Sequence, residues 1–154
     1  MSSATNKAIV RRFIDQVLNR KQLDLFDEFL LDDARIHRSG QALGQGSARA
    51  WISSCAVTFP DGQHLIEDCF AEADRVVART RFAGTYTTDL SDIPGTGRWI
   101  SLPGIAIFRL ENARIVEAWL MHDDLGLLRQ LGVVSSPLEK VIRQIYQRNK
   151  GENK

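Results

Sequence analysis

Two adjacent carboxylates, Asp123 and Asp124, stand where a strand-like segment of the sequence passes into a helix-like one. Alternation along residues 115–123 predicts that Asp123 ends an apolar and aromatic face, which it shares with Ile115, Glu117, Trp119 and Met121. Burial there would raise the pKa of a carboxyl group and suit it for proton transfer. On spacing alone, the more common role for either aspartate is to cap the helix that follows.

Four apolar or aromatic residues are candidates for the wall of a ligand pocket near Asp123. Trp119, Met121, Phe82 and Tyr86 would form the sides of a pocket for a flat, apolar ligand. For each of them ordinary core packing is the commoner explanation. The hydroxyl of Tyr86 could donate to a carbonyl or enolate oxygen, or point to solvent at the end of its strand.

The histidines and cysteines give weaker signals. His37 ends a short strand, where it could reach the rim of a pocket. His122 has the opposite strand parity to Asp123 and should point away from it unless a bulge intervenes. His64 follows a turn and is expected to be exposed. No HxH or HExxH group and no glycine-rich phosphate loop is present, and the two cysteines lack CxxC spacing. The sequence thus predicts no metal and no cofactor.

Composition favours one compact domain. The chain has 154 residues, 44% of them hydrophobic, and a formal net charge of +1. That charge gives no electrostatic case for nucleic acid or for an anionic membrane. No apolar run is long enough to span a bilayer, and the N-terminus lacks the apolar core of a secretion signal. We therefore expect a cytoplasmic protein with reduced, buried thiols.

The periodicity changes along the chain from helical to strand-like. Apolar spacing predicts a helix at 5–20, with Thr5 as a plausible N-cap, and further helices near 22–31 and at 47–58. A short strand is expected at 34–38. After the turn chemistry of residues 59–62, alternation predicts an antiparallel meander, whose strands cover 63–72, 75–87, 98–110 and 114–122.

The fold class expected from this order is α+β, with helices covering one face of a curved sheet. We place residues 1–134 in one domain and residues 135–154 in a C-terminal helical extension of it. The sequence Ser136-Pro137-Leu138-Glu139 combines an N-cap, a proline at the first helical position and a capping box.

Several weak motifs, taken in order, resemble the SnoaL-like polyketide cyclases of the nuclear-transport-factor-2-like (NTF2-like) superfamily. These motifs are Asn6…Val10-Arg11-Arg12-Phe13, Gly46, Phe59-Pro60-Asp61, Gly84-Thr85, Gly95-Thr96-Gly97-Arg98, Ile115-Val116-Glu117…Trp119 and Asp123-x-Leu125-Gly126-Leu127-Leu128-x-Gln130-Leu131-Gly132. The resemblance covers roughly residues 5–132. It implies a cone-shaped fold, in which a curved antiparallel sheet is wrapped by N-terminal helices around a deep pocket.

The resemblance also implies an activity. Characterised members close a ring by intramolecular aldol condensation without metal or organic cofactor, and an aspartate after the tryptophan strand is their acid/base. Spacing from Trp119 carries that role to Asp123 and leaves Asp124 as the cap. Where many members have a histidine after Gly84-Thr85, this chain has Tyr86.

The expected function is therefore polyketide cyclase-type carbonyl chemistry on a small apolar or aromatic ligand. The alternatives are a noncatalytic small-molecule-binding protein and an epoxide-hydrolase-like or isomerase-like enzyme, for which Arg109 and Asp123 share parity on adjacent strands. The arginines and apolar residues of the outer sheet face predict a homodimer, as does the family.

Overall fold

A computed structural model describes residues 2–38, 40–89, 93–134 and 140–141 of the chain. Helix α1 (Ser3–Arg12) runs on into the π-helical stretch η1 (Phe13–Asn19), as the spacing of apolar residues predicted. The cap is Ser2 rather than Thr5, because the Ser2 hydroxyl accepts the backbone N–H of Thr5 at 3.2 Å.

The prediction of a helix at 22–31 is mostly wrong. The chain forms a 3₁₀ turn, η2 (Leu23–Leu25), and a single helical turn, α2 (Phe26–Phe29), before it becomes extended at Leu30. Leu30 is buried and pairs with Ile115 of another strand. Pairing in the sheet therefore overrides a helical preference that is weak over so short a segment.

Within the described residues, six strands form one open sheet, in the order β2-β1-β6-β5-β4-β3. The strands are β1 (Leu30–Arg38), β2 (Gln41–Gly44), β3 (Gln63–Glu72), β4 (Arg75–Tyr86), β5 (Arg98–Glu111) and β6 (Arg114–His122). The predicted meander of β3 to β6 is confirmed, with every neighbouring pair antiparallel. The sequence did not predict β2, nor the parallel pairing of β1 with β6.

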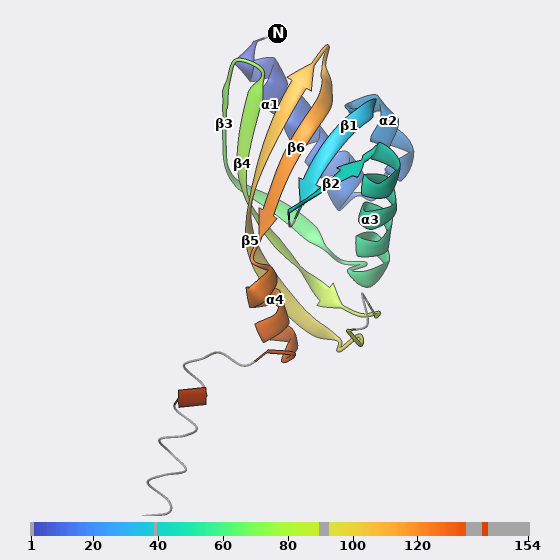
Figure 1. Cartoon of the computed structure of the whole chain (residues 1–154), viewed down its shortest axis with the longest axis vertical. Helices are drawn as coiled ribbons and strands as arrows, with labels where there is room; N and C mark the ends of the chain where they lie inside the picture. Colours follow the sequence, from blue (N-terminus) through green and yellow to red (C-terminus); the bar gives the residue numbers. More distant parts are fainter. Residues whose placement is uncertain (1, 39, 90–92, 135–139, 142–154) are drawn as a thin grey trace, which may run out of the picture.

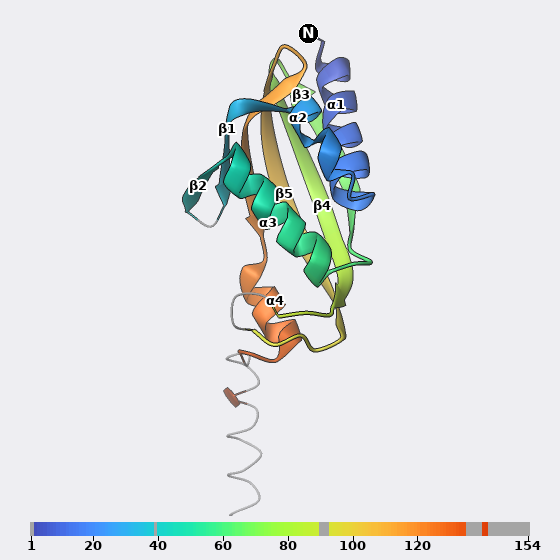
Figure 2. The same cartoon turned by 90° about the vertical axis from the view of Figure 1, so that its right-hand side faces the viewer.

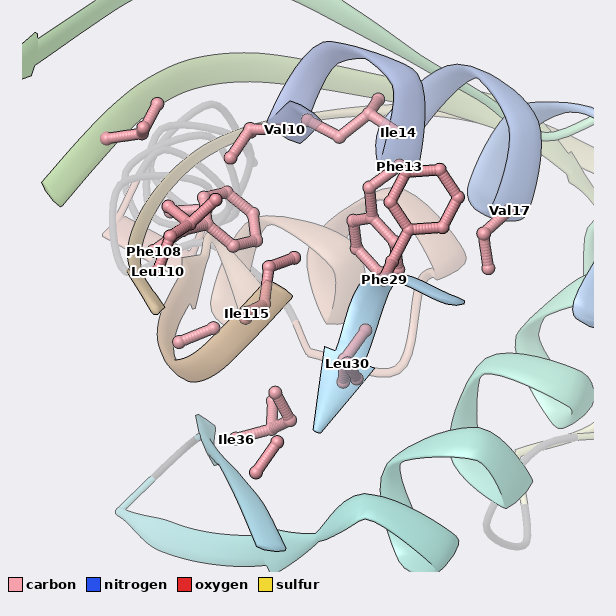
Figure 3. Close-up of a cluster of buried hydrophobic side chains, with 14 of the residues drawn as sticks. Val10, Phe13, Ile14, Val17, Phe29, Leu30, Ile36, Phe108, Leu110 and Ile115 are labelled. Atoms are coloured by element: carbon pink, nitrogen blue, oxygen red, sulfur yellow. The ribbon is translucent and has the colours of Figure 1, made fainter. Parts of the chain in front are cut away.

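The helices lie on one face of this sheet. Helix α3 (Gln45–Thr58) follows β2, and α1, α2 and α3 cover the same inner face (Figures 1 and 2). Figure 3 shows Phe13 beside Phe29, near Val10, Ile14 and Val17. The remaining helix, α4 (Asp124–Leu131), begins directly after β6 at the far end of the sheet from the N-terminus. This α+β arrangement is the predicted fold class.

The predicted C-terminal helix lies outside the described residues, except for residues 140–141. Within the described part of the chain, no helix is long and apolar enough to cross a membrane.

Candidate active site

A cavity of about 160 Å³ lies between the inner face of the sheet and the helices. Its walls come from η1, α2, α3, α4 and five strands, and most of its lining is apolar. The lining includes Phe13, Val17, Leu18, Trp51, Ile52, Phe59, Phe82, Leu102, Ala106, Phe108, Ala118 and Leu120. The polar groups are few: Lys21, Arg38, Cys55, His64, Thr80, His122 and Asp124. Such a composition suits an apolar ligand that carries a few polar atoms.

A β-bulge decides which residues of β6 face this cavity. Arg109 of β5 pairs with Glu117, whereas the next residue, Leu110, pairs with Ile115, so that Val116 is the extra residue. A bulge of one residue reverses the alternation of every side chain beyond it. Ile115 is therefore buried in the core, and from position 118 onward the even-numbered residues line the cavity.

Two imidazoles face each other inside the cavity. The rings of His64 on β3 and His122 on β6 lie 6.5 Å apart, and the ring of Phe82 is 4.8 Å from that of His64. The side chain of Asn19 fixes the backbone of His64, accepting its N–H at 2.7 Å and donating to its carbonyl at 3.1 Å. The sequence-based expectation that His64 is exposed is wrong, as is the expectation that His122 points away.

Both imidazoles are kept neutral by their surroundings. Burial, together with the nearby His122 and Lys21, lowers the pKa of His64 to about 4. Burial also lowers the pKa of His122, and the positive charge of Arg38 acts in the same direction, while Asp124 opposes both. A neutral imidazole can accept a proton at pH 7.

Glycine makes room for the His122 ring. Gly104 of β5 is the register partner of His122, and a Cβ atom at position 104 would lie 2.8 Å from Cδ2 of the imidazole. It would also lie 3.2 Å from Oγ1 of Thr80. The ring can therefore lie this close to β5 only because residue 104 has no side chain.

Arg38 and Asp124 form an ion pair beside the imidazoles. Nη2 of Arg38 lies 3.5 Å from Oδ1 of Asp124, and the guanidinium carbon lies 4.8 Å from the centre of the Trp51 ring. Nε of Arg38 is buried and has no hydrogen-bond partner among the described residues. The other cation, Lys21, donates to the carbonyls of Asn19 and Gly62.

The structure places Asp123 outside the cavity. Asp123 is exposed and caps α4, its carboxylate accepting the N–H of Gly126 at 2.7 Å. The desolvation on which its expected acid/base role depended is therefore lacking. Strand parity and the family resemblance placed Asp123 in the pocket and left Asp124 as the cap, and both placements are wrong because the bulge at Val116 shifts the parity by one. Helix capping, the role that spacing alone favoured, is the role that Asp123 has.

The same shift puts two expected wall residues, Trp119 and Met121, on the outer face of the sheet, where His37 of β1 also lies. Trp119 stacks on His37 with ring centres 5.3 Å apart, and Met121 is 68% exposed. His37 is bound through Nε2 to Glu117 at 2.8 Å. Their expected contact with a pocket ligand is not supported by these positions.

The remaining expected residues are divided between cavity and core. Phe82 lines the cavity. Tyr86 is buried in a second apolar cluster, where its hydroxyl donates to the carbonyl of Ile93 at 2.6 Å, so it does not face the cavity. Arg109 is bound to Glu111 and Glu117 on the outer face rather than to Asp123. The pairing expected for an epoxide-hydrolase-like site is therefore not formed.

The described residues contain no group of three or more His, Cys, Asp or Glu placed to hold a metal ion. Both cysteines are free and partly buried. Burial raises the pKa of the Cys55 thiol to about 11, so Cys55 is a protonated, unreactive part of the cavity wall.

Burial of a neutral His64 predicts a loss of stability in acid. In the unfolded chain His64 is protonated below its ordinary pKa of 6.5, whereas in the folded chain it stays neutral until the pH falls to about 4. The free energy of unfolding should therefore fall by up to about 3 kcal/mol as the pH falls through this window. Chemical denaturation at pH 7 and pH 4.5 should show this loss in the wild type and a smaller loss in His64→Gln. Equal losses in the two proteins would contradict the assignment.

Comparison with known proteins agrees with this architecture. The family model of SnoaL-like polyketide cyclases matches residues 8–131. No curated protein sequence matches the chain significantly. TsrD from Streptomyces laurentii superposes with a TM-score of 0.78 at 29% identity, over 87% of this chain and 99% of that one.

Two further solved structures share the fold. AclR from Streptomyces galilaeus, proposed to be a hydroxylase, has a TM-score of 0.80 at 22% identity, over 87% of this chain and all of that one (100%). IdmH from Streptomyces antibioticus, proposed to be a polyketide cyclase, has a TM-score of 0.73 at 23% identity, over 82% and 98% of the two chains.

Proposed function

Because the chain belongs to the family of SnoaL-like polyketide cyclases, we propose that it catalyses cofactor-independent acid/base chemistry on a carbonyl compound in the inner cavity. The reaction that suits the site is an intramolecular aldol cyclisation or a related enolisation. One observation carries the proposal: His122, a neutral imidazole, faces a mostly apolar cavity beside a cation and a carboxylate.

His122 replaces Asp123 as the acid/base in this proposal. Its free ring nitrogen removes a proton from the carbon next to a carbonyl group and leaves an enolate. The enolate carbon then attacks a second carbonyl of the same molecule, forming the C–C bond and an alkoxide. The imidazolium returns its proton to that alkoxide, so the protein ends in its starting state. The apolar walls keep water away from the enolate.

Exchange of α-protons tests the proposal without knowledge of the natural substrate. A small apolar ketone, 2-tetralone, is incubated in D₂O with the protein, and deuterium uptake is followed by NMR. We expect exchange faster than in protein-free buffer of the same pH. Binding of 2-tetralone without accelerated exchange would favour the noncatalytic binding protein. If 2-tetralone neither binds nor exchanges, the cavity is not the site of this chemistry.

The outer face of the sheet supports the proposed homodimer. A row of side chains runs across neighbouring strands on this face, formed by Phe70, Val77, Ile107 and Trp119 in successive register pairs. Phe70 is 58% exposed, and Met121 with its register partner Ile105 extends the apolar surface. A single chain would leave this surface in water, whereas a second copy would bury it.

Met121→Lys is expected to weaken this association at least about tenfold, because it introduces a charge into an apolar contact. Sedimentation equilibrium at micromolar concentration measures the effect. Val57→Lys is the matched control, since Val57 is 66% exposed on α3, and it should leave the mass unchanged. A monomeric wild type would overturn the dimer.

A further inference from the structure

The guanidinium of Arg38 has more hydrogen-bonding capacity than its protein partners use. Among the described residues its one hydrogen bond, from Nη2 to Asp124, is 3.5 Å long, and its buried Nε donor has no partner there. A buried donor left without a partner costs about 1–3 kcal/mol, so a ligand acceptor that satisfied it would be favoured. Stacking on Trp51 holds the guanidinium plane against the cavity wall.

The charge of Arg38 reaches the inside of the cavity. It lowers the pKa of His122 and also acts to lower that of Cys55, two groups that line the same space. Lys21, the other cation, has its ammonium group engaged with two backbone carbonyls and lies near Asp61. The charge of Lys21 is offset by Asp61, which lies outside the cavity lining, and that of Arg38, within the described residues, by a single long contact with Asp124. Of the two cations, Arg38 is therefore the one whose partner a ligand anion could replace or join.

We propose that Arg38 binds an anionic oxygen of the ligand, so that the cavity selects apolar compounds carrying an ionised enol or phenol, such as enolised 1,3-dicarbonyl compounds. This inference rests on the proposed function, because it assigns the ligand class of the same cavity. Tyr86, which the sequence suggested for the enolate oxygen, is committed to Ile93. Arg38 lines the cavity, and its guanidinium keeps donors beyond the 3.5 Å contact with Asp124, so we assign this role to its terminal nitrogens.

The ionisation of bound 4-nitrophenol tests the inference, because its neutral and anionic forms differ in absorbance. The probe is titrated across neutral pH with and without saturating protein. We expect the bound pKa to fall by at least about one unit, which corresponds to a tenfold preference for the anion. Arg38→Met should abolish the fall, and Arg38→Lys should keep part of it because the charge remains. Arg35→Met, an exposed arginine of the same strand, should leave it unchanged.

Asp124→Asn should act in the opposite direction. Removing the carboxylate that competes for Arg38 should lower the bound pKa further, and His122→Gln should preserve the shift, since the inference places the anion on Arg38. An equal shift in the wild type and a folded Arg38→Met variant would overturn the inference but leave the proposed function intact. A pKa shift without exchange of 2-tetralone would overturn the proposed function alone. No binding of either form of the probe by a protein that exchanges 2-tetralone would likewise overturn the inference and leave the proposed function intact.

Discussion

Turnover in a His122→Gln variant is expected to fall by about 10²–10⁴-fold, the usual contribution of one positioned acid/base. Glutamine approximates the size and polarity of the imidazole but cannot take up a proton near neutral pH. The walls formed by Phe82, Leu120 and their neighbours remain, so the affinity for 2-tetralone should change little. The measurement is the rate of α-proton exchange, with kcat and KM determined separately.

The pH dependence adds a second readout. Since the pKa of His122 lies below its ordinary value, the wild-type rate should rise through that lowered pKa and be level at neutral pH. His37→Gln is the matched control, because His37 is bound to Glu117 on the outer face. It should retain wild-type exchange. A His122→Gln variant with undiminished exchange would remove His122 from the chemistry.

Replacing Phe13 by alanine is expected to cost about 3–5 kcal/mol in the free energy of unfolding. The Phe13 ring is 5% exposed and lies 5.8 Å from Phe29 and 6.3 Å from both Phe26 and Phe108. Phe13 therefore packs η1 against α2 and against β5 of the sheet (Figure 3). Its truncation removes apolar contacts and leaves a void that neighbouring rings fill only in part.

Denaturation in urea measures this loss, and Val57→Ala is its control. Val57 is also apolar but 66% exposed, and its truncation should change the free energy of unfolding by no more than about 0.5 kcal/mol. A small effect at Phe13 would mean that the core cluster can collapse around the void. It would also mean that the helical layer contributes less to folding than its burial indicates.

The sequence predicted the fold well where the signals are local and repeated. Alternation over ten or more residues and tight turns between strands located β3 to β6 within one or two residues. The turns fit because Ala73, Asn112 and Ala113 adopt positive φ, as two-residue hairpin turns require. The parallel pairing of β1 with β6 joins segments about 80 residues apart, and no local pattern indicates it.

The prediction of which residues face the cavity failed because of one residue. Val116 is the bulge, and nothing in Ile115-Val116-Glu117 distinguishes it from regular strand. Simple alternation therefore assigned Trp119, Met121 and Asp123 to the pocket and His122 to the outside. Gly104 was the available signal, because a glycine inside a strand often marks a close approach of another group. Its partner across the sheet is the histidine that alternation had turned away.

The central claim is that proton transfer takes place in the cavity at His122 and not at the cap residue Asp123. The most direct measurement compares α-proton exchange of 2-tetralone in His122→Gln and Asp123→Asn, because asparagine preserves the N-cap of α4 while removing the acid. The account predicts that Asp123→Asn exchanges at nearly the wild-type rate while His122→Gln loses about 10²–10⁴-fold. Loss of exchange in Asp123→Asn with retention in His122→Gln would contradict it.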